Sequence, residues 1–421
     1  MGEQSSAIRG LAHISSLTLA ILLTLMMTSI SAWGQTFRVL HTFTGSPDGV
    51  RPTSLLEVNG SLYGTTSTGG RYGFGTIFKL SSQGTESVIY SFTGGKDGAN
   101  PTALARDSKG NVYGVAQGGG NSSCHTSGGF TGCGVIFKVS SNKLTVLHTF
   151  SGGTDGALPQ QVVVGPSGDL YGVAEFGGDL GCGIGQGYGC GVVFELNMSG
   201  TETVLYTFSN PDPTGGDLPV GLIMDSAGNL FGATYFGGSF SLCMYGCGAL
   251  FEITRSGTAV PFYRFTGGVD GAYPNGNLLV DPKGNLYGTA FEGGDSSCVI
   301  PESLSAGCGV VFKVSSAGVE TVLHTFTGPD GEGPGAGLVA SKGKVYGETT
   351  GGGTDSFGVL FDLSTGGEEV LYNFKGSTDG QAPNGSLLID SKGNLYGIAY
   401  AGGDLSCNPP YGCGTLFRLT P

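Results

Sequence analysis

Residues 281–294 of the chain read DPKGNLYGTAFEGG, and this stretch decides the fold because it is written seven times with small variations. An earlier copy, residues 107–120, reads DSKGNVYGVAQGGG. The aromatic residue of its Tyr-Gly or Phe-Gly pair recurs at Tyr63, Tyr113, Tyr171, Phe231, Tyr287, Tyr346 and Tyr396. Successive copies are 50 to 60 residues apart. A period of this size, with several short strand-like runs per unit, is typical of a β-propeller.

Each repeat contains four strand-like runs. In the fifth copy they are residues 274–281, 285–291, 309–314 and 320–326. All are rich in β-branched or aromatic residues and are bordered by Gly, Pro or Asp, as strands are. Short turn sequences with Asp or Ser and a glycine separate the first run from the second, and the third from the fourth, which predicts tight hairpins. Each repeat is therefore expected to fold as a four-stranded antiparallel blade.

The two ends of the chain carry incomplete repeats that fit together. A lone run of the fourth type, residues 37–43, precedes the first repeat, and the last repeat ends with a run of the third type, residues 414–419. We therefore predict an all-β, seven-bladed β-propeller in which the N-terminal strand completes the last blade and covers an open sheet edge. A solenoid of stacked repeats is the alternative, but it would need distinct capping units at both ends.

The first 34 residues have the composition of an export signal. Arg9 precedes an apolar run at residues 17–27, and Ala32 and Gly34 are placed as in a cleavage site. We expect residues 1–34 to be a signal peptide and residues 35–421 to form one propeller domain of a secreted or periplasmic protein. An uncleaved N-terminal anchor is the alternative, and no membrane span is expected after cleavage.

The charge of the chain limits its partners. Only 12% of residues are charged, the net charge is −13, and no stripe of Lys and Arg is present. This argues against nucleic acid and anionic membrane surfaces as partners. We expect a monomer that binds a glycan or an extracellular protein, without a cofactor.

The ten cysteines all lie between the second and third runs of a repeat, two in each of five repeats. In an exported protein this arrangement predicts local disulfides rather than zinc sites, which would want Cys-x-x-Cys knuckles or added histidines. Repeats 1 and 6 lack both cysteines and carry Phe74 and Phe357 in place of the second one. The predicted pairs are Cys124–Cys133, Cys182–Cys190, Cys243–Cys247, Cys298–Cys308 and Cys407–Cys413.

Candidate ligand-binding residues come from positions that vary while the repeat around them does not. In a meander of this order, the long loops that carry the cysteines and the loops between blades emerge on the same face. Rigid scaffolds commonly bind ligands through variable loops. Positions four and five residues after the Tyr-Gly anchor reach that face. In repeats 3, 4 and 5 they hold two carboxylates and four aromatic rings. The predicted ligand-binding residues are Glu175, Phe176, Tyr235, Phe236, Phe291 and Glu292. Ordinary packing of aromatic loops is the alternative.

Catalytic and metal-binding arrangements have weaker support. His41, His148 and His324 share one position of the fourth run, where other repeats have tyrosine, so we interpret them as framework residues. A Ser-His-Asp arrangement has no good histidine, which leaves Glu175 and Glu292 as acid–base candidates. The loops between blades contain seven aspartates that could suggest calcium, but Asp-Gly is also a turn pair, and we expect structural turns and no metal. They are Asp48, Asp97, Asp155, Asp217, Asp270, Asp330 and Asp379.

The sequences of the repeats resemble those of a known family. Residues 284–294 (GNLYGTAFEGG), 307–318 (GCGVVFKVSSAG) and 321–331 (TVLHTFTGPDG) are similar to the GloVer tandem repeat of the choice-of-anchor group of exported bacterial proteins. The resemblance covers about residues 37–419. It implies export and often a C-terminal anchoring segment, which is not found before Pro421, and this favours a released or periplasmic protein. It implies no catalytic residues.

Three functions are compatible with these observations. The first is a non-catalytic exported propeller that binds a glycan or protein on its loop-bearing face. The second is a carbohydrate-active hydrolase or lyase that uses carboxylates on that face, and the third is a structural or adhesive repeat protein. The sole tryptophan, Trp33, lies in the expected signal peptide, so sugar stacking would have to rely on Tyr and Phe.

Overall fold

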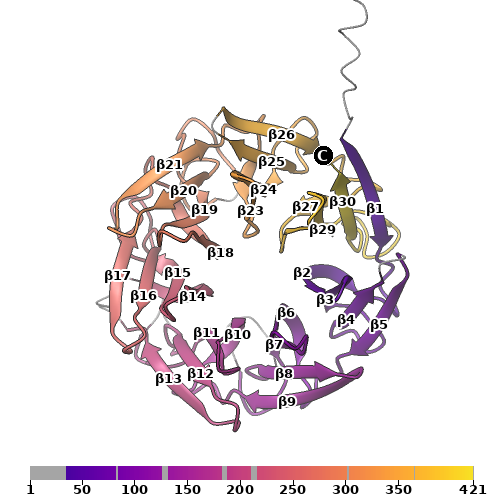
Figure 1. Ribbon diagram of the computed structural model, residues 1–421, viewed down its shortest axis with the longest axis vertical. Helices are drawn as coiled ribbons and strands as arrows, with labels where there is room; N and C mark the ends of the chain where they lie inside the picture. Colours follow the sequence, from indigo (N-terminus) through magenta and orange to yellow (C-terminus); the bar gives the residue numbers. More distant parts are fainter. Residues whose placement is uncertain are drawn as a thin grey trace, which may run out of the picture.

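The computed structural model describes residues 35–81, 84–125, 131–182, 187–209, 216–300, 303–364 and 366–420. The predicted signal peptide, residues 1–34, lies outside the described residues. Seven antiparallel sheets form a closed ring around a central axis (Figure 1), and no helix occurs in the described parts of the chain. The predicted all-β, seven-bladed propeller is confirmed.

The strands of blades 1 to 6 run outward from the axis in chain order, and blade 7 takes β1 as its outermost strand. Blade 1 is β2 (Val50–Val58), β3 (Ser61–Thr68), β4 (Thr76–Leu80) and β5 (Glu86–Ser91). Blade 2 is β6 (Ala99–Arg106), β7 (Val112–Gly118), β8 (Val135–Ser140) and β9 (Lys143–Thr149). Blade 3 is β10 (Ala157–Val164), β11 (Leu170–Phe176), β12 (Val192–Leu196) and β13 (Glu202–Thr207). Blades 4 and 5 are β14 (Gly216–Met224), β15 (Leu230–Gly237), β16 (Ala249–Ile253) and β17 (Ala259–Arg264); and β18 (Ala272–Val280), β19 (Leu286–Glu292), β20 (Val310–Val314) and β21 (Glu320–Thr325).

The last two blades have inner strands in two pieces. Blade 6 is β22 (Glu332–Pro334), β23 (Val339–Ser341), β24 (Lys344–Gly351), β25 (Val359–Ser364) and β26 (Gly367–Asn373). Blade 7 is β27 (Gln381–Pro383), β28 (Leu388–Ile389), β29 (Leu395–Ala401), β30 (Thr415–Thr420) and β1 (Thr36–Thr42). Glycines interrupt both inner strands, at Gly335 and Gly337 in blade 6 and at Gly385 in blade 7. The repeat pattern did not predict this break, and glycine alone does not account for it, because β18 contains Gly276 in the same Pro-Asn-Gly sequence and is unbroken.

The ring is closed as the sequence predicted. Strand β1 pairs antiparallel with β30, with Thr36 opposite Thr420 and Phe37 opposite Leu419. In Figure 1 the indigo strand lies along the outer edge of the yellow blade. The seventh blade therefore takes its outer strand from the beginning of the chain and its other strands from the end.

One packing arrangement explains why a glycine and a phenylalanine recur at fixed positions of the repeat. A phenylalanine of the third strand, such as Phe78, is fully buried and lies over the glycine of the Tyr-Gly pair. A Cβ atom on Gly64 would lie 2.2 Å from the Phe78 ring, so only glycine fits there. The same ring meets Phe43, which directly follows β1 of the preceding blade, at 5.1 Å between centroids. Equivalent aromatic contacts join every blade to the next, at 5.0 to 5.4 Å.

Candidate functional site

The loops between blades and the long loops within blades meet on one face of the ring, here called the loop-bearing face. The amide of Gly70, in the loop after β3, donates to the carbonyl of Gly45, in the turn before β2, at 2.7 Å. The amide of Gly120 makes the same bond to the carbonyl of Gly95 in the next blade, at 2.8 Å. The predicted grouping of the two kinds of loop on one face therefore agrees with their hydrogen bonds.

All five predicted disulfides are present, with Cα–Cα distances of 5.2 to 5.6 Å. The cystine Cys243–Cys247 covers a glycine of the neighbouring turn, since a Cβ on Gly267 would lie 2.7 Å from both sulfurs. In blade 1 the ring of Phe74 covers Gly94 in the same way. The aromatic ring and the cystine therefore occupy equivalent places, as the exchange between them in the sequence suggested.

The second cysteine of each pair also marks a contact between blades. Its carbonyl accepts a hydrogen bond, at 2.8 to 3.1 Å, from the residue that precedes the first proline of the next blade. The phenylalanine carbonyl does the same in blades 1 and 6. The donor–acceptor pairs are Arg51–Cys413, Asn100–Phe74, Leu158–Cys133, Leu218–Cys190, Tyr273–Cys247, Gly333–Cys308 and Ala382–Phe357. Each donor has a φ between 50° and 58°.

These seven donors, here called the pre-proline residues, were missed by the sequence analysis. A residue before proline normally has an extended backbone, and a left-handed conformation costs free energy for any residue but glycine. The hydrogen bond to the preceding blade compensates for that strain. The backbone is thus fixed while the side chain varies, and this variation within Asp-Gly-x-x-Pro was the signal that could have revealed them.

The pre-proline residues contact the variable positions that had been singled out. Arg51 lies over the ring of Tyr400, with the guanidinium carbon 5.4 Å from the ring centroid. The side chain of Asn100 donates to the carbonyl of Ser67 at 3.0 Å. Tyr273 stacks on Tyr235 at 5.2 Å between centroids. Pairs of variable side chains, one from each of two neighbouring blades, therefore surround the inner edge of the loop-bearing face.

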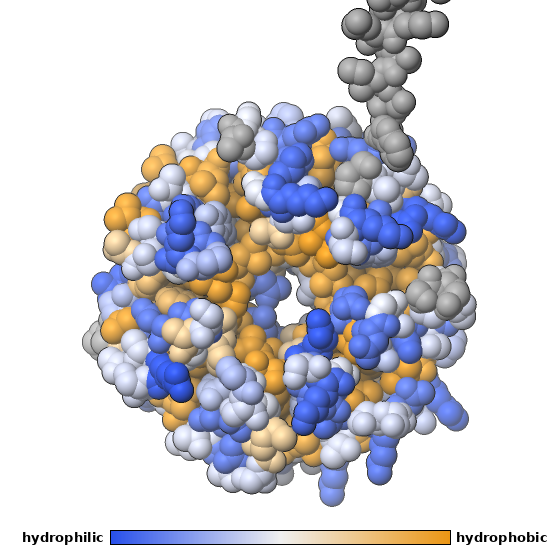
Figure 2. All heavy atoms as spheres, viewed as in Figure 1, coloured by the Kyte–Doolittle hydropathy of each residue, from blue (hydrophilic) through white to orange (hydrophobic). Residues whose placement is uncertain are grey.

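Below this edge the ring encloses a cavity of about 450 Å³. Figure 2 shows the molecule hollowed at its centre. The lining is rich in carboxamides, which belong to Gln160, Gln161, Asn275, Asn277 and Asn384. The side chain of Gln161 donates to Asn277 Oδ1 at 2.8 Å and accepts from the amide of Leu222, also at 2.8 Å. No Lys or Arg is among the described residues that line the cavity.

Glu175 is the one carboxylate among those lining residues. Its Oε2 atom accepts a hydrogen bond from the side chain of Gln160, whose own oxygen accepts from Gln117 at 2.9 Å. Burial raises the pKa of Glu175 to about 7, and the Gln160 hydrogen bond opposes this rise. The carboxyl group is therefore poised to change its protonation state near neutral pH.

Of the six predicted ligand-binding residues, Glu175 and Tyr235 line the cavity. Phe236 contacts the Tyr235 ring edge-on at 4.9 Å, and Phe176 contacts Tyr188 at 6.2 Å instead of joining this group. Phe291 lies against the backbone of Gly333, where an added Cβ would come within 2.8 Å of its ring.

Glu292 holds a loop of its own blade. Its carboxylate is 3% exposed and accepts hydrogen bonds from the amide of Leu304 at 3.0 Å and from the amide and hydroxyl of Ser305 at 2.5 and 2.9 Å. It is close enough to the tyrosines that its charge, after burial, helps to raise the pKa of Tyr235 to about 12. The structure thus brings Tyr235, Phe236, Tyr273 and Glu292 together, and places Glu175 on the cavity wall.

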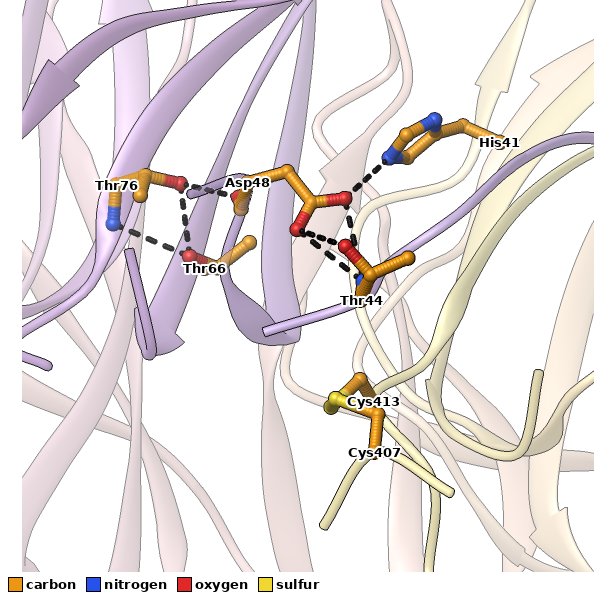
Figure 3. A network of polar contacts seen from close by, with 7 residues as sticks. All are labelled: His41, Thr44, Asp48, Thr66, Thr76, Cys407 and Cys413. Atoms are coloured by element: carbon orange, nitrogen blue, oxygen red, sulfur yellow. Dashed lines mark hydrogen bonds and ion pairs between the residues drawn. A yellow bond between two sulfur atoms is a disulfide. The ribbon is translucent and has the colours of Figure 1, made fainter. Parts of the chain in front are cut away.

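Six of the seven predicted aspartates hold turns between blades, and Asp217 instead lies in β14. Asp48 accepts from the amide and hydroxyl of Thr44 at 3.1 and 3.0 Å, and from His41 Nε2 at 3.0 Å (Figure 3). The hydroxyl of Thr76 in blade 1 donates to the backbone carbonyl of Asp48 at 2.9 Å. His41 and Asp48 therefore connect the outer strand of blade 7 to blade 1, which is the framework role expected of this histidine.

A family model described as the Gloeobacter/Verrucomicrobia repeat matches residues 26–184, 123–300 and 298–421. The chain belongs to this repeat family. The match agrees with the predicted resemblance to the GloVer tandem repeat. No curated protein matches this member of the Gloeobacter/Verrucomicrobia repeat family.

Solved structures similar to this family member include two extracellular domains from B. thetaiotaomicron. One belongs to a protein described as a hybrid two-component system, with a TM-score of 0.56, 14% identity, and coverage of 92% of this chain and 41% of that chain. The other belongs to one described as a one-component system, with a TM-score of 0.54, 12% identity, and coverage of 92% and 42%. The chain thus spans about two fifths of these domains, and the likeness concerns the fold.

The five cystines fit an exported protein. Within the described residues, no helix is long and apolar enough to cross a membrane.

Proposed function

We propose that this propeller is an exported, non-catalytic binding protein that holds a glycan at the inner edge of its loop-bearing face. In this proposal residues 1–34 are removed as a signal peptide, and residues 35–421 act as a monomer in the periplasm or outside the cell. The observation that carries the proposal is the carboxamide-rich cavity, with a tyrosine at its wall and no Lys or Arg among its described lining residues.

The chemistry of the cavity suits a sugar. A carboxamide both donates and accepts hydrogen bonds, as a sugar hydroxyl does, so Gln160, Asn275 and Asn384 can satisfy hydroxyls in either direction. A volume of about 450 Å³ falls within the usual range of small-molecule sites. Tyr235 lines the cavity next to this polar wall, and its ring is backed by the fully buried ring of Tyr273. The Tyr273 hydroxyl is buried and has no hydrogen-bond partner among the described residues.

Hydrolysis is the second candidate, and Glu175 is the observation that favours it. A carboxyl group with a pKa of about 7 suits a general acid. Glycoside hydrolysis normally needs a second carboxylate on the other side of the bond, however. Among the described residues Glu175 has no carboxylate companion in the cavity lining, and Glu292 is occupied by its loop. These arrangements support binding over catalysis.

A glycan screen followed by calorimetry on residues 35–421 tests the proposal. Replacing Tyr235 and Phe236 together by alanine is expected to weaken binding by about 1–3 kcal/mol, the range for aromatic anchors. Because both rings also pack in the core, Gln160→Leu provides a second variant that removes hydrogen-bonding groups and leaves the tyrosines in place.

Lys283→Ala, in a hairpin on the opposite face, is the matched control and should bind as the unaltered protein does. The proposal would be wrong if affinity survived both site variants but was lost when the hairpins of the opposite face were altered. Turnover of a bound glycan that Glu175→Gln abolishes would establish the hydrolase instead.

A further inference from the structure

One position of the outer strands alternates between two side chains around the ring. It holds His41, His148 and His324 in three blades, and Tyr90, Tyr206, Tyr263 and Tyr372 in the other four. Both types contact the aspartate of the following turn: His324 Nε2 lies 3.0 Å from Asp330 Oδ2, and the Tyr263 hydroxyl donates to Asp270 at 3.0 Å. Since either side chain performs this framework task, the choice of histidine needs a separate reason.

The choice between histidine and tyrosine correlates with the residue at one position on the outer strand of the next blade. That residue lies opposite the last apolar position of the third strand, and its register is the same in all seven blades. After the three histidines it is Glu86, Glu202 and Glu368. After Tyr90, Tyr206 and Tyr372 it is Leu144, Ala259 and Phe37. Only Tyr263 is followed by a carboxylate, Glu320. Histidine therefore always comes with a second acidic residue, and tyrosine usually does not.

The interface between blades 5 and 6 brings these groups closest together. Asp330 Oδ1 accepts from the amide and hydroxyl of Thr327 at 2.8 and 2.9 Å, which leaves Oδ2 directed at His324. Ligand atoms of His324, Asp330 and Glu368 all lie within 4.8 Å of one another. Glu368 Oε1 is shielded from solvent and has no hydrogen-bond partner among the described residues. A buried carboxylate oxygen without a donor is costly, and a cation bound next to Oε1 would offset that cost.

We propose that His324, Asp330 and Glu368 bind a divalent cation of the zinc class between blades 5 and 6. One imidazole nitrogen and two carboxylate oxygens are a common zinc ligand set, and a water molecule would complete the tetrahedron. The charge of the dication would balance the two carboxylates. Ligand atoms of a tetrahedral zinc site lie about 3.3 Å apart, so small side-chain rotations would close the cluster.

The proposed ion would connect β21 to β26, the outer strands of their blades. It would cross-link blades 5 and 6 at the outside of the ring, where Figure 1 shows β21 and β26, and away from the central axis. The clusters at His41 and His148 have the same composition, and His41 lies as close to its aspartate, at 3.0 Å, as His324 does. Among the described residues, however, only the His324 cluster has all three ligand atoms within 4.8 Å of one another. The proposal is therefore confined to the His324 cluster.

Binding of Zn²⁺ and Co²⁺ to residues 35–421, prepared without a histidine tag, tests the proposal by calorimetry and by the visible absorption of bound Co²⁺. His324→Tyr is the decisive variant, because tyrosine occupies this position next to an aspartate elsewhere in the ring and the fold should be kept. It is expected to lower the number of bound ions by one. Glu368→Gln should weaken binding to this site at least tenfold.

A gain of binding gives an independent test. The Tyr263 interface already contains Asp270 and Glu320 and lacks only the imidazole. Tyr263→His should therefore raise the number of bound ions by one, while Tyr90→His, which faces Leu144, should leave it unchanged.

The proposal is overturned if neither ion binds, or if His324→Tyr leaves the number of bound ions and the Co²⁺ spectrum unchanged. It is also overturned if NMR titration in the presence of Zn²⁺ finds His324 still protonated above pH 7. Any of these results would leave His324 as a framework partner of Asp330, like the tyrosine at this position in blade 4.

Discussion

Blades 5 and 6 are neighbours that stabilise the same loop in two ways. In blade 5 the loop before β20 is closed by Cys298–Cys308, ten residues apart. In blade 6 the loop before β25 has no cystine, and the ring of Phe357 covers Gly376 of the neighbouring turn. Yet the hydrogen bond to the next blade is nearly identical: Gly333 to Cys308 at 2.9 Å, and Ala382 to Phe357 at 3.0 Å.

The comparison separates two tasks that the cystine seemed to combine. The contact between blades depends on the backbone carbonyl and is made with or without sulfur. The disulfide is found where the loop is longer, and there it limits the freedom of a segment that would otherwise be mobile. Covalent links in this ring therefore serve its loops, and its closure rests on packing and hydrogen bonds.

Removal of β1 should lower the stability of the protein most, because neither a cystine nor an aromatic side chain can replace that strand. Deleting residues 35–43 leaves β30 as an open edge and removes Phe43, which is fully buried. We expect the free energy of unfolding to fall by more than about 3–5 kcal/mol, which is the cost of truncating one buried phenylalanine. Thermal unfolding and light scattering would show a lower melting temperature and association through the open edge. An unchanged melting temperature would mean that Cys407–Cys413 alone can hold blade 7 together.

A buried carboxyl group distinguishes blade 6 further. Burial raises the pKa of Glu348 to about 8, although the amide of Gly385 donates to it at 2.7 Å and opposes the rise. The folded chain thus keeps this proton up to about pH 8, whereas the unfolded chain loses it near pH 4.5. Stability should therefore fall as the pH rises from about 4.5 to 8.

Glu348→Gln should remove the part of that fall that Glu348 contributes, while Glu175 still contributes its own. Relative to the unaltered protein, the variant should gain on the order of 3 kcal/mol in unfolding free energy between pH 5 and pH 9. Urea unfolding at the two pH values measures it. Thr289, the counterpart in blade 5, donates its hydroxyl to the carbonyl of Gly335, so Thr289→Val should cost stability equally at both pH values. Parallel pH profiles for Glu348→Gln and the unaltered protein would contradict the assignment.

Replacing Cys298 and Cys308 by alanine together should cost roughly 2–3 kcal/mol, the chain-entropy value for a loop of this length. Limited proteolysis should cut residues 293–309 faster, while the β-sheet circular dichroism should be retained. Loss of the sheet signal would mean that the cystine supports the blade as well as its loop.

Phe357→Ala should have the smallest effect, about 1 kcal/mol, because the ring is 37% exposed and the backbone contact does not need it. Hydrogen exchange of the Ala382 amide is the sharper measurement, and its protection should persist. If that amide exchanged freely in the variant, the ring rather than the carbonyl would hold blades 6 and 7 together at this point.

Features that recur in several repeats could be predicted from the sequence. Seven copies define the strand order, so the expected strand at residues 37–43 differs from β1 by one residue at each end. The exchange of cystine for phenylalanine likewise revealed the pairing of the cysteines, which the structure confirms.

What occurs once, or depends on contacts between blades, could not be predicted in this way. Glu292 is held by Leu304 and Ser305, in a loop without a counterpart in other repeats. The left-handed backbone of Tyr273 recurs in every blade, but it depends on a carbonyl of the preceding blade. The match between His324 and Glu368 was present in the sequence, but it joins different positions of consecutive repeats. It could be recognised only once the blades were placed side by side.

The pairing of β1 with β30 also has a consequence for the order of folding. Thr36 and Thr420 are about 380 residues apart, so β1 is made first and its partner last. At about 5–20 residues per second, β1 waits roughly 20–80 seconds for β30 to be synthesised. Phe43, however, meets Phe78 of blade 1, only about 35 residues later in the chain. Blade 1 can therefore shelter the first strand during synthesis and present it, already positioned, to the last strand to emerge.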